Sequence, residues 1–368
     1  MARRTTLLPS IALVLALACG GEERPPAAAP RPPEAAARPA QPPASTAPDD
    51  LPYGLLVALS PFEVGPDGKV RSKPTAARLE LVTRERGVWR VRAIEDPESN
   101  VFHKAIAYDG GILTLGGTAA AIKLWRPDLS GTSYTSETIW ARDFGGKFSR
   151  MRDAELADLD GDGSPELVVA THDQGVVAVV RRDPSGGWKV EEIDAEKDTF
   201  VHEIEIGDLD GDGVPEVYAT PSEPNRLDGT PQTGKVTRYV PARGEGRTVV
   251  ADLGDRHAKE ILAGDVDGDG RDELYVAVEA VSGGQVEIRR FDHGTAPDAA
   301  VVIATLDDTQ TRFLTAGDVD GDGRREMVAA GMKSGLWLLR PGPAPATGTW
   351  EKSLIDARSG GFEHASVL

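Results

Sequence analysis

The sequence of 368 residues has a single cysteine, few aromatic residues and no surplus of positive charge. One cysteine excludes a disulfide framework and any metal or iron–sulfur site built from several thiolates. Lys and Arg number 41 against 59 Asp and Glu, giving a net charge of −18, so the chain lacks the basic stripes that nucleic-acid binding requires. Aromatic residues make up 5%, whereas 41 Gly and 27 Pro residues indicate many turns and short strands rather than long helices.

Apolar runs long enough to span a membrane are also missing. Arg3 and Arg4 precede an apolar stretch, residues 7–18, that is too short to cross a bilayer and is typical of a secretory signal peptide. Cys19 follows directly, in the segment Leu-Ala-Leu-Ala-Cys-Gly-Gly. This segment resembles the lipobox of bacterial lipoproteins, which implies that residues 1–18 are a lipoprotein-type signal peptide and that Cys19 is acylated. The protein would then be anchored to the bacterial cell envelope, at the outer membrane, and an ordinary secreted protein is the alternative.

Residues 19–50 are rich in Pro and Ala and show no hydrophobic periodicity. Such a segment cannot bury a core, so we expect a disordered or polyproline-like tether. The remaining residues, 51–368, are the predicted folded domain.

A repeat of about fifty residues organises this domain. The sequence Asp-Leu-Asp-Gly-Asp-Gly-Ser-Pro-Glu at 158–166 returns with small changes at 208–216, 265–273 and 318–326, at intervals of 50, 57 and 53 residues. Each copy is followed by β-rich runs and turns, which predict four strands per repeat, as in a β-propeller blade. A degenerate copy at 102–115 keeps only Asp109 of the aspartate loop.

The repeats predict an all-β fold, a β-propeller of six four-stranded blades closed by pairing of the N- and C-terminal segments. Three strands of one blade are expected at 53–59, 77–83 and 88–94, and the fourth at 362–368. Closure in this way removes open strand edges, which otherwise promote aggregation. A propeller cut off in mid-blade, or one with seven blades, is the alternative.

The aspartate loops contain the residue types of a calcium site. Carboxylates at positions 1, 3 and 5, a glycine at 6, a backbone carbonyl at 7 and an acid at 9 can surround one hard cation. The EF-hand pattern needs its Glu at position 12, where these loops have Val169, Ala219, Val276 and Ala329. The predicted ligands are Asp158, Asp160, Asp162, Ser164 and Glu166; Asp208, Asp210, Asp212, Val214 and Glu216; Asp265, Asp267, Asp269, Arg271 and Glu273; and Asp318, Asp320, Asp322, Arg324 and Glu326.

Acidic turns without an ion are the alternative for these loops. It is unfavourable, because carboxylates crowded into nine residues repel one another unless a counter-charge is present. The Asp109 loop lacks the second and third carboxylates, so no metal is expected there.

Loops of this kind between the first two strands of a blade resemble the FG-GAP/VCBS-type repeats of integrin-α-like propellers. The resemblance covers nearly all of 51–368, and four of the six expected blades have the full motif. It implies about four structural calcium ions. Magnesium is a poorer fit, since it prefers octahedral sites that keep several waters.

A second pattern appears when the innermost strands are aligned on the first loop aspartate. Six residues before that position stands a basic or imidazole side chain in every repeat: His103, Arg152, His202, Lys259, Arg312 and His364. We expect this collar to line one end of the central channel. The slightly favoured interpretation is charge pairing with the acids at the next position, Asp153, Glu203 and Glu260. The alternative is that the collar holds an anionic group, more tightly in mild acid as the histidines gain charge.

No nucleophile, zinc-protease or phosphate-loop motif is present. The favoured interpretation is a calcium-stabilised, envelope-anchored propeller that binds a protein or glycan partner, as a monomer that meets the membrane only through its lipid. The alternative is a lyase or hydrolase of an acidic polysaccharide, with His103, His202 and His364 as acid/base or metal-binding groups. The insertions 61–75 and 220–234 are expected at the collar end of the blades.

Overall fold

Antiparallel β-strands form almost all of the regular structure in the computed structural model, which describes residues 54–357 except 86, 132, 146–148, 225–230 and 281–283. One 3-10 turn, η1 (Pro241–Arg243), is the helical segment of this part of the chain. Among the described residues there is no helix with the length and apolar character needed to cross a bilayer. The expected all-β class is confirmed. The predicted signal peptide, Cys19 and the predicted tether lie outside the described residues.

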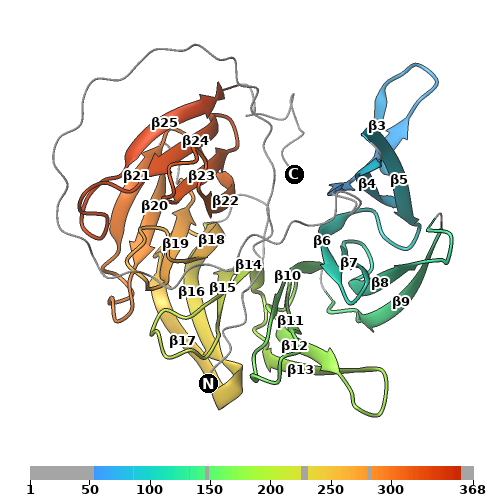
Figure 1. The fold of residues 1–368 in the computed structure, drawn as a ribbon, viewed down its shortest axis with the longest axis horizontal. Coiled ribbons are helices and arrows are strands. Elements are labelled where there is room, and N and C mark those ends of the chain that lie inside the picture. The colour runs from blue at the N-terminus through green and yellow to red at the C-terminus, as the bar shows by residue number, and fades with distance from the viewer. Residues whose placement is uncertain are drawn as a thin grey trace. The chain divides into compact units, whose positions relative to one another are not determined.

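Five sheets have four strands each, paired in the order in which the chain forms them (Figure 1). This meander is the arrangement of a propeller blade, and the five sheets are called blades below. Their strands are β6 (Phe102–Tyr108), β7 (Gly111–Gly116), β8 (Ala121–Pro127) and β9 (Tyr134–Ala141); β10 (Met151–Ala157), β11 (Glu166–Thr171), β12 (Val177–Arg182) and β13 (Trp188–Asp194); β14 (Phe200–Gly207), β15 (Glu216–Glu223), β16 (Thr233–Val240) and β17 (Glu245–Asp252); β18 (Ala258–Gly264), β19 (Glu273–Val278), β20 (Val286–Phe291) and β21 (Val301–Leu306); and β22 (Thr311–Gly317), β23 (Glu326–Gly331), β24 (Gly335–Arg340) and β25 (Glu351–Asp356).

A further sheet at the start of the domain has three described strands, β1 (Gly54–Leu59), β4 (Ala77–Glu85) and β5 (Val88–Asp96). β1 lies at its edge, and Leu55, Leu56 and Val57 are 37%, 38% and 36% exposed. The strand predicted to cover this edge, 362–368, lies outside the described residues. Six blades and a closed ring therefore remain predictions.

Regular structure extends into both predicted insertions. Within 61–75, β2 (Phe62–Val64) and β3 (Val70–Pro74) form a two-stranded sheet, and this insertion connects β1 to β4. In the other insertion, β15 extends to Glu223 and β16 begins at Thr233. It connects the second and third strands of its blade, so it leaves the blade at the end opposite the aspartate loop.

The hydrophobic core lies between consecutive blades. In β11, Leu167 and Val169 pack with residues of the β6–β9 blade, whereas Val168 and Ala170 pack with residues of the β14–β17 blade. Because both faces of this strand are buried, it is an unbroken apolar run instead of an alternation of apolar and polar residues. Similar clusters join the β14–β17 blade to the β18–β21 blade and the latter to the β22–β25 blade. This packing brings the innermost strands β10, β14 and β18 into contact.

Candidate functional site

The four aspartate loops connect the first and second strands of four blades and share one hydrogen-bond pattern. In the loop at 158–166, Gly163 has a φ of 92°, a conformation that favours glycine, and its N–H donates to Asp158 Oδ2 at 3.0 Å. The Glu166 carboxylate accepts from the Leu159 N–H at 2.8 Å. The bond from the position-6 glycine to the first aspartate recurs in the other three loops. The sequence repeat is therefore also a repeat of local structure.

Each loop brings carboxylates together, but not the same set. Oxygens within 4.8 Å of one another come from Asp265, Asp267, Asp269 and Glu273; from Asp158, Asp160 and Glu166; from Asp208, Asp210 and Asp212; and from Asp318, Asp320 and Glu326. The loop at 265–273 thus assembles all four predicted acidic ligands, and the others assemble three. Asp162, Glu216 and Asp322 lie outside these groups. The position-7 carbonyls of Ser164, Val214, Arg271 and Arg324 remain predicted ligands.

An arginine from the third strand of the same blade contacts the second aspartate of every loop. The N–O distances are 3.8 Å for Arg181 and Asp160, 3.2 Å for Arg238 and Asp210, 2.5 Å for Arg290 and Asp267, and 3.0 Å for Arg340 and Asp320. The protein therefore supplies part of the counter-charge that the crowded carboxylates need.

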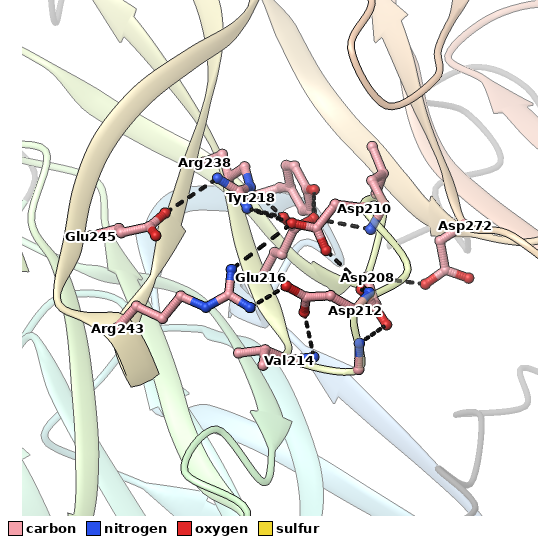
Figure 2. A network of polar contacts seen from close by, with 12 residues as sticks. Asp208, Asp210, Asp212, Val214, Glu216, Tyr218, Arg238, Arg243, Glu245 and Asp272 are labelled. Carbon is pink, nitrogen blue, oxygen red and sulfur yellow. Dashed lines mark hydrogen bonds and ion pairs between the residues drawn. The ribbon is translucent and has the colours of Figure 1, made fainter.

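Figure 2 shows this arrangement in the loop at 208–216. Arg238 pairs with both Asp210 and Glu216, and Arg243 pairs with Asp212. The hydrogen bond with Arg243 lowers the pKa of Asp212. The Tyr218 hydroxyl donates to Glu216.

The donor set nevertheless fits calcium. Asp158 Oδ1 is shielded from solvent and has no hydrogen-bond partner in the described part of the chain. Burial raises the pKa of Glu273 to about 7 and also raises the pKa of Glu166, so the arginines do not fully compensate these carboxylates. A site made only of oxygen donors is the type that calcium prefers. The carboxylates grouped in each loop would hold the ion.

Neighbouring loops are joined through their eighth residue. Asp272 Oδ2 accepts a hydrogen bond from the Asp208 N–H at 3.0 Å (Figure 2), and Arg325 donates to the Asp265 carbonyl at 3.1 Å. The eighth residue of the first two loops is proline, Pro165 and Pro215. The second, third and fourth loops are thus linked in a series.

Asp109, in the degenerate loop, is held by two arginines. Arg126 of its own blade donates to it at 2.6 Å, and Arg182 of the next blade donates at 2.8 Å. The hydrogen bonds with these guanidinium groups, that of Arg126 first, lower the pKa of the Asp109 carboxyl.

The collar residues lie at β-bulges of the innermost strands. His103 is on β6, Arg152 on β10, His202 on β14, Lys259 on β18 and Arg312 on β22, whereas His364 lies outside the described residues. In all five strands the pairing with the second strand shifts at this point. A bulge leaves one residue unpaired and re-aims its side chain. The alignment therefore detected a structural feature shared by the five blades.

Two collar histidines have lowered pKa values, which reduces the charge that they can add in mild acid. Burial, with help from the nearby Arg152, lowers the pKa of His103 to about 4. Burial also lowers the pKa of His202 well below its usual range, and Arg152 and Lys259 add to the shift. Both shifts disfavour the charged imidazole.

Among the described residues, the acids at the next position form no direct ion pair with the collar. Asp153 lies 2.9 Å from Lys104 Nζ and also accepts from the Ile204 N–H at 2.9 Å. Burial raises the pKa of both Glu203 and Glu260 well above their usual range. Over the described residues, no hydrogen bond joins His103 or His202 to either glutamate, the pairs that acid/base catalysis would use.

Two neighbours of the collar were missed in the sequence. His172 and Glu279 each follow the first aspartate of their loop by fourteen residues. The His172 ring stacks on Phe200 with centroids 4.5 Å apart, and Glu279 lies 3.2 Å from Lys259 Nζ. Extending the same alignment forward past the loop would have found both.

Comparison with known proteins identifies the repeat. A family model described as an FG-GAP-like repeat matches residues 158–219 and 265–329. The chain contains FG-GAP-like repeats. All four aspartate loops of this FG-GAP repeat protein fall inside the matched segments.

Solved structures show the same fold at low sequence identity. The FG-GAP repeat protein is similar to a proposed 6-phosphogluconolactonase from Bacteroides fragilis NCTC 9343, with a TM-score of 0.50, 11% identity, and 80% of this chain and 84% of that chain covered. It is also similar to one from Bacteroides uniformis ATCC 8492, with a TM-score of 0.50, 13% identity, and 82% and 85% covered. At these identities only the fold is shared. A search of curated proteins finds none that matches the sequence.

Proposed function

We propose that this FG-GAP repeat protein is a calcium-stabilised binding module that presents one end of its blades to a protein or a glycan. The observation that carries the proposal is the fourfold loop structure, in which three or four carboxylate oxygens lie within 4.8 Å of one another. Their repeated geometry suits a structural role, since each loop ties the first strand of a blade to the second. Binding would then take place at the other end, where the collar and the insertions leave the blades.

The expected contribution of calcium is comparable with the stability of a whole domain. Extracellular calcium modules bind with dissociation constants of roughly 10⁻⁴–10⁻³ M. At tenfold saturation each site adds about 1.4 kcal/mol to the folded state. Four sites together add about 5–6 kcal/mol, within the usual range of 5–15 kcal/mol for domain stability.

We further propose that the domain closes as six blades, with residues 362–368 pairing along β1. The support is the apolar edge of β1, which has a partner only on the β4 side among the described residues. Chain closure of this kind would join the first and last blades and remove the edge.

The proposed location is the bacterial envelope, through a lipid on Cys19 and the tether 19–50. This part of the proposal rests on the sequence alone. It would place a monomeric module at the outer membrane with contact to the bilayer only through the lipid.

A glycan and protein interaction screen with the calcium-loaded protein tests the binding role. We expect a partner that binds in calcium and is lost when a chelator unfolds the loops. A partner retained in full after calcium is removed would contradict the link between the loops and binding. A screen in which the calcium-loaded protein retains no protein or glycan would contradict the role itself.

A further inference from the structure

His202 is a buried imidazole whose two ring nitrogens have no hydrogen-bond partner within the described part of the chain. Its exposed fraction is 4%. Buried polar groups are nearly always paired, because an unpaired one loses its water without compensation. A neutral imidazole has one nitrogen that donates and one that accepts. His202 therefore needs one hydrogen-bond acceptor and one hydrogen-bond donor as partners.

The rings around His202 offer no such partners. Phe200 lies against it with ring centroids 3.7 Å apart. The rings of His257 and His172 lie at 6.0 and 6.4 Å. None of these rings forms a hydrogen bond with a His202 nitrogen in the described part of the chain.

The charges near His202 are positive. Arg152 and Lys259, from the blades on either side, both lower its pKa, and so do His257 and His172. Lys259 shares Glu279 with His257, at 3.2 and 3.0 Å. Arg152 has neither an ion pair nor a hydrogen bond in the part of the chain described, in contrast to the loop arginines.

Three acidic groups face this region, and none of them forms an ion pair with Arg152 among the described residues. Asp153 is held by Lys104 and by the Ile204 N–H. Glu203 and Glu260 act electrostatically on Arg152 without a contact of ion-pair length, and burial raises the pKa of both. Arg312 adds positive charge near Lys259 and helps to lower its pKa, which burial lowers most. An arginine without a direct partner thus stands beside an imidazole without one.

We propose that Arg152, His202 and Lys259 form a binding site for a sugar acid, an anion that also carries hydroxyl groups. The carboxylate would meet Arg152 and Lys259, and it or a ring oxygen would accept from the His202 N–H. A hydroxyl would donate to the other His202 nitrogen, which a simple carboxylate or sulfate cannot do. This site specifies the ligand of the proposed binding module and therefore rests on that function.

A metal ion is a poorer occupant than an anion. Among the described residues, no group of three candidate ligand atoms within 4.8 Å includes a histidine nitrogen. Arg152 and Lys259 would also repel a divalent cation.

Calorimetry with glucuronate as the probe tests the site, using glucose and acetate as comparison ligands on the calcium-loaded protein. Glucuronate should bind at least tenfold more tightly than glucose, which lacks the charge, and than acetate, which lacks the hydroxyls. Arg152→Gln should weaken glucuronate about tenfold or more, since it removes a charge-assisted hydrogen bond. The matched control Arg71→Gln, an exposed arginine of β3 paired with Asp67, should bind as the unaltered protein does.

A second variant covers the possibility that Arg152→Gln fails to fold. His202→Phe keeps a buried ring and removes both nitrogens, so it should retain or raise the melting temperature and lose glucuronate binding. Nitrogen chemical shifts of labelled histidine should change on adding glucuronate to the unaltered protein.

Absence of glucuronate binding to protein that does bind calcium would overturn the site and leave the calcium-stabilised module standing. Equal affinity for glucuronate and glucose, unchanged binding in His202→Phe, or zinc binding that depends on His202 would also overturn it.

Discussion

The variant Arg290→Met removes the arginine that pairs with the carboxylates of the loop at 265–273, and so measures what this positive charge contributes to stability. Arg290 is 3% exposed and contacts Asp267 and Glu273, each 2% exposed. Removing it leaves two buried carboxylates without their cation, and breaking a buried ion pair on one side costs about 3–5 kcal/mol. We expect a loss of this size in the free energy of unfolding when the protein is free of calcium.

Calcium should replace the missing charge. In saturating calcium the ion lies among the same carboxylates, so the loss caused by Arg290→Met should fall by more than half. The assay is urea unfolding with a chelator and with calcium. The matched control is Arg340→Met, because Arg340 and Asp320 are 32% and 37% exposed and such surface pairs contribute about 0–1 kcal/mol.

The reasoning is refuted by either of two results. One is an equal loss for Arg290→Met with and without calcium, which would mean that no ion enters the loop. The other is an equal loss for Arg290→Met and Arg340→Met in the chelator, which would mean that burial does not determine the effect.

Three further predictions concern pH, closure and anchoring. Because the pKa of His103 falls from 6.5 unfolded to about 4 folded, the unfolded state binds more protons between these values and stability falls as the pH drops from about 6.5 to 4. His103→Gln should remove up to about 2–3 kcal/mol of this acid sensitivity, measured by urea unfolding at several pH values. Deleting 362–368 should lower the melting temperature and cause self-association through β1, visible in size-exclusion chromatography, whereas an unchanged monomer would contradict closure. Cys19→Ser should abolish incorporation of labelled palmitate in bacteria, and continued labelling would exclude Cys19 as the acylated residue.

The strands and loops could be predicted because their signals are local. The β-rich run expected after the loop at 158–166 corresponds to β11. The hydrogen bonds between residues of one aspartate loop connect positions at most seven apart, such as Leu159 and Glu166. The collar positions were found because every repeat has a basic or imidazole residue at the same distance before its loop. Periodicity of this kind is visible in a single sequence.

The features that the sequence did not predict depend on contacts between residues that are far apart in the chain. Arg290 lies 23 residues after Asp267, and only the pairing of β18, β19 and β20 brings the two together. The pKa of His202 depends on Arg152 and Lys259 from two other blades and on burial that no local pattern reveals. The arginines beside the loops and the strength of the histidine pKa shifts could not be predicted for this common reason.

Calcium titration of chelator-treated protein by calorimetry tests the central claim most directly. The account predicts about four sites, three after Asp160→Ala, together with a melting temperature that falls substantially when calcium is removed. Calorimetry without a calcium signal, or a melting temperature that does not respond to the chelator, would contradict it.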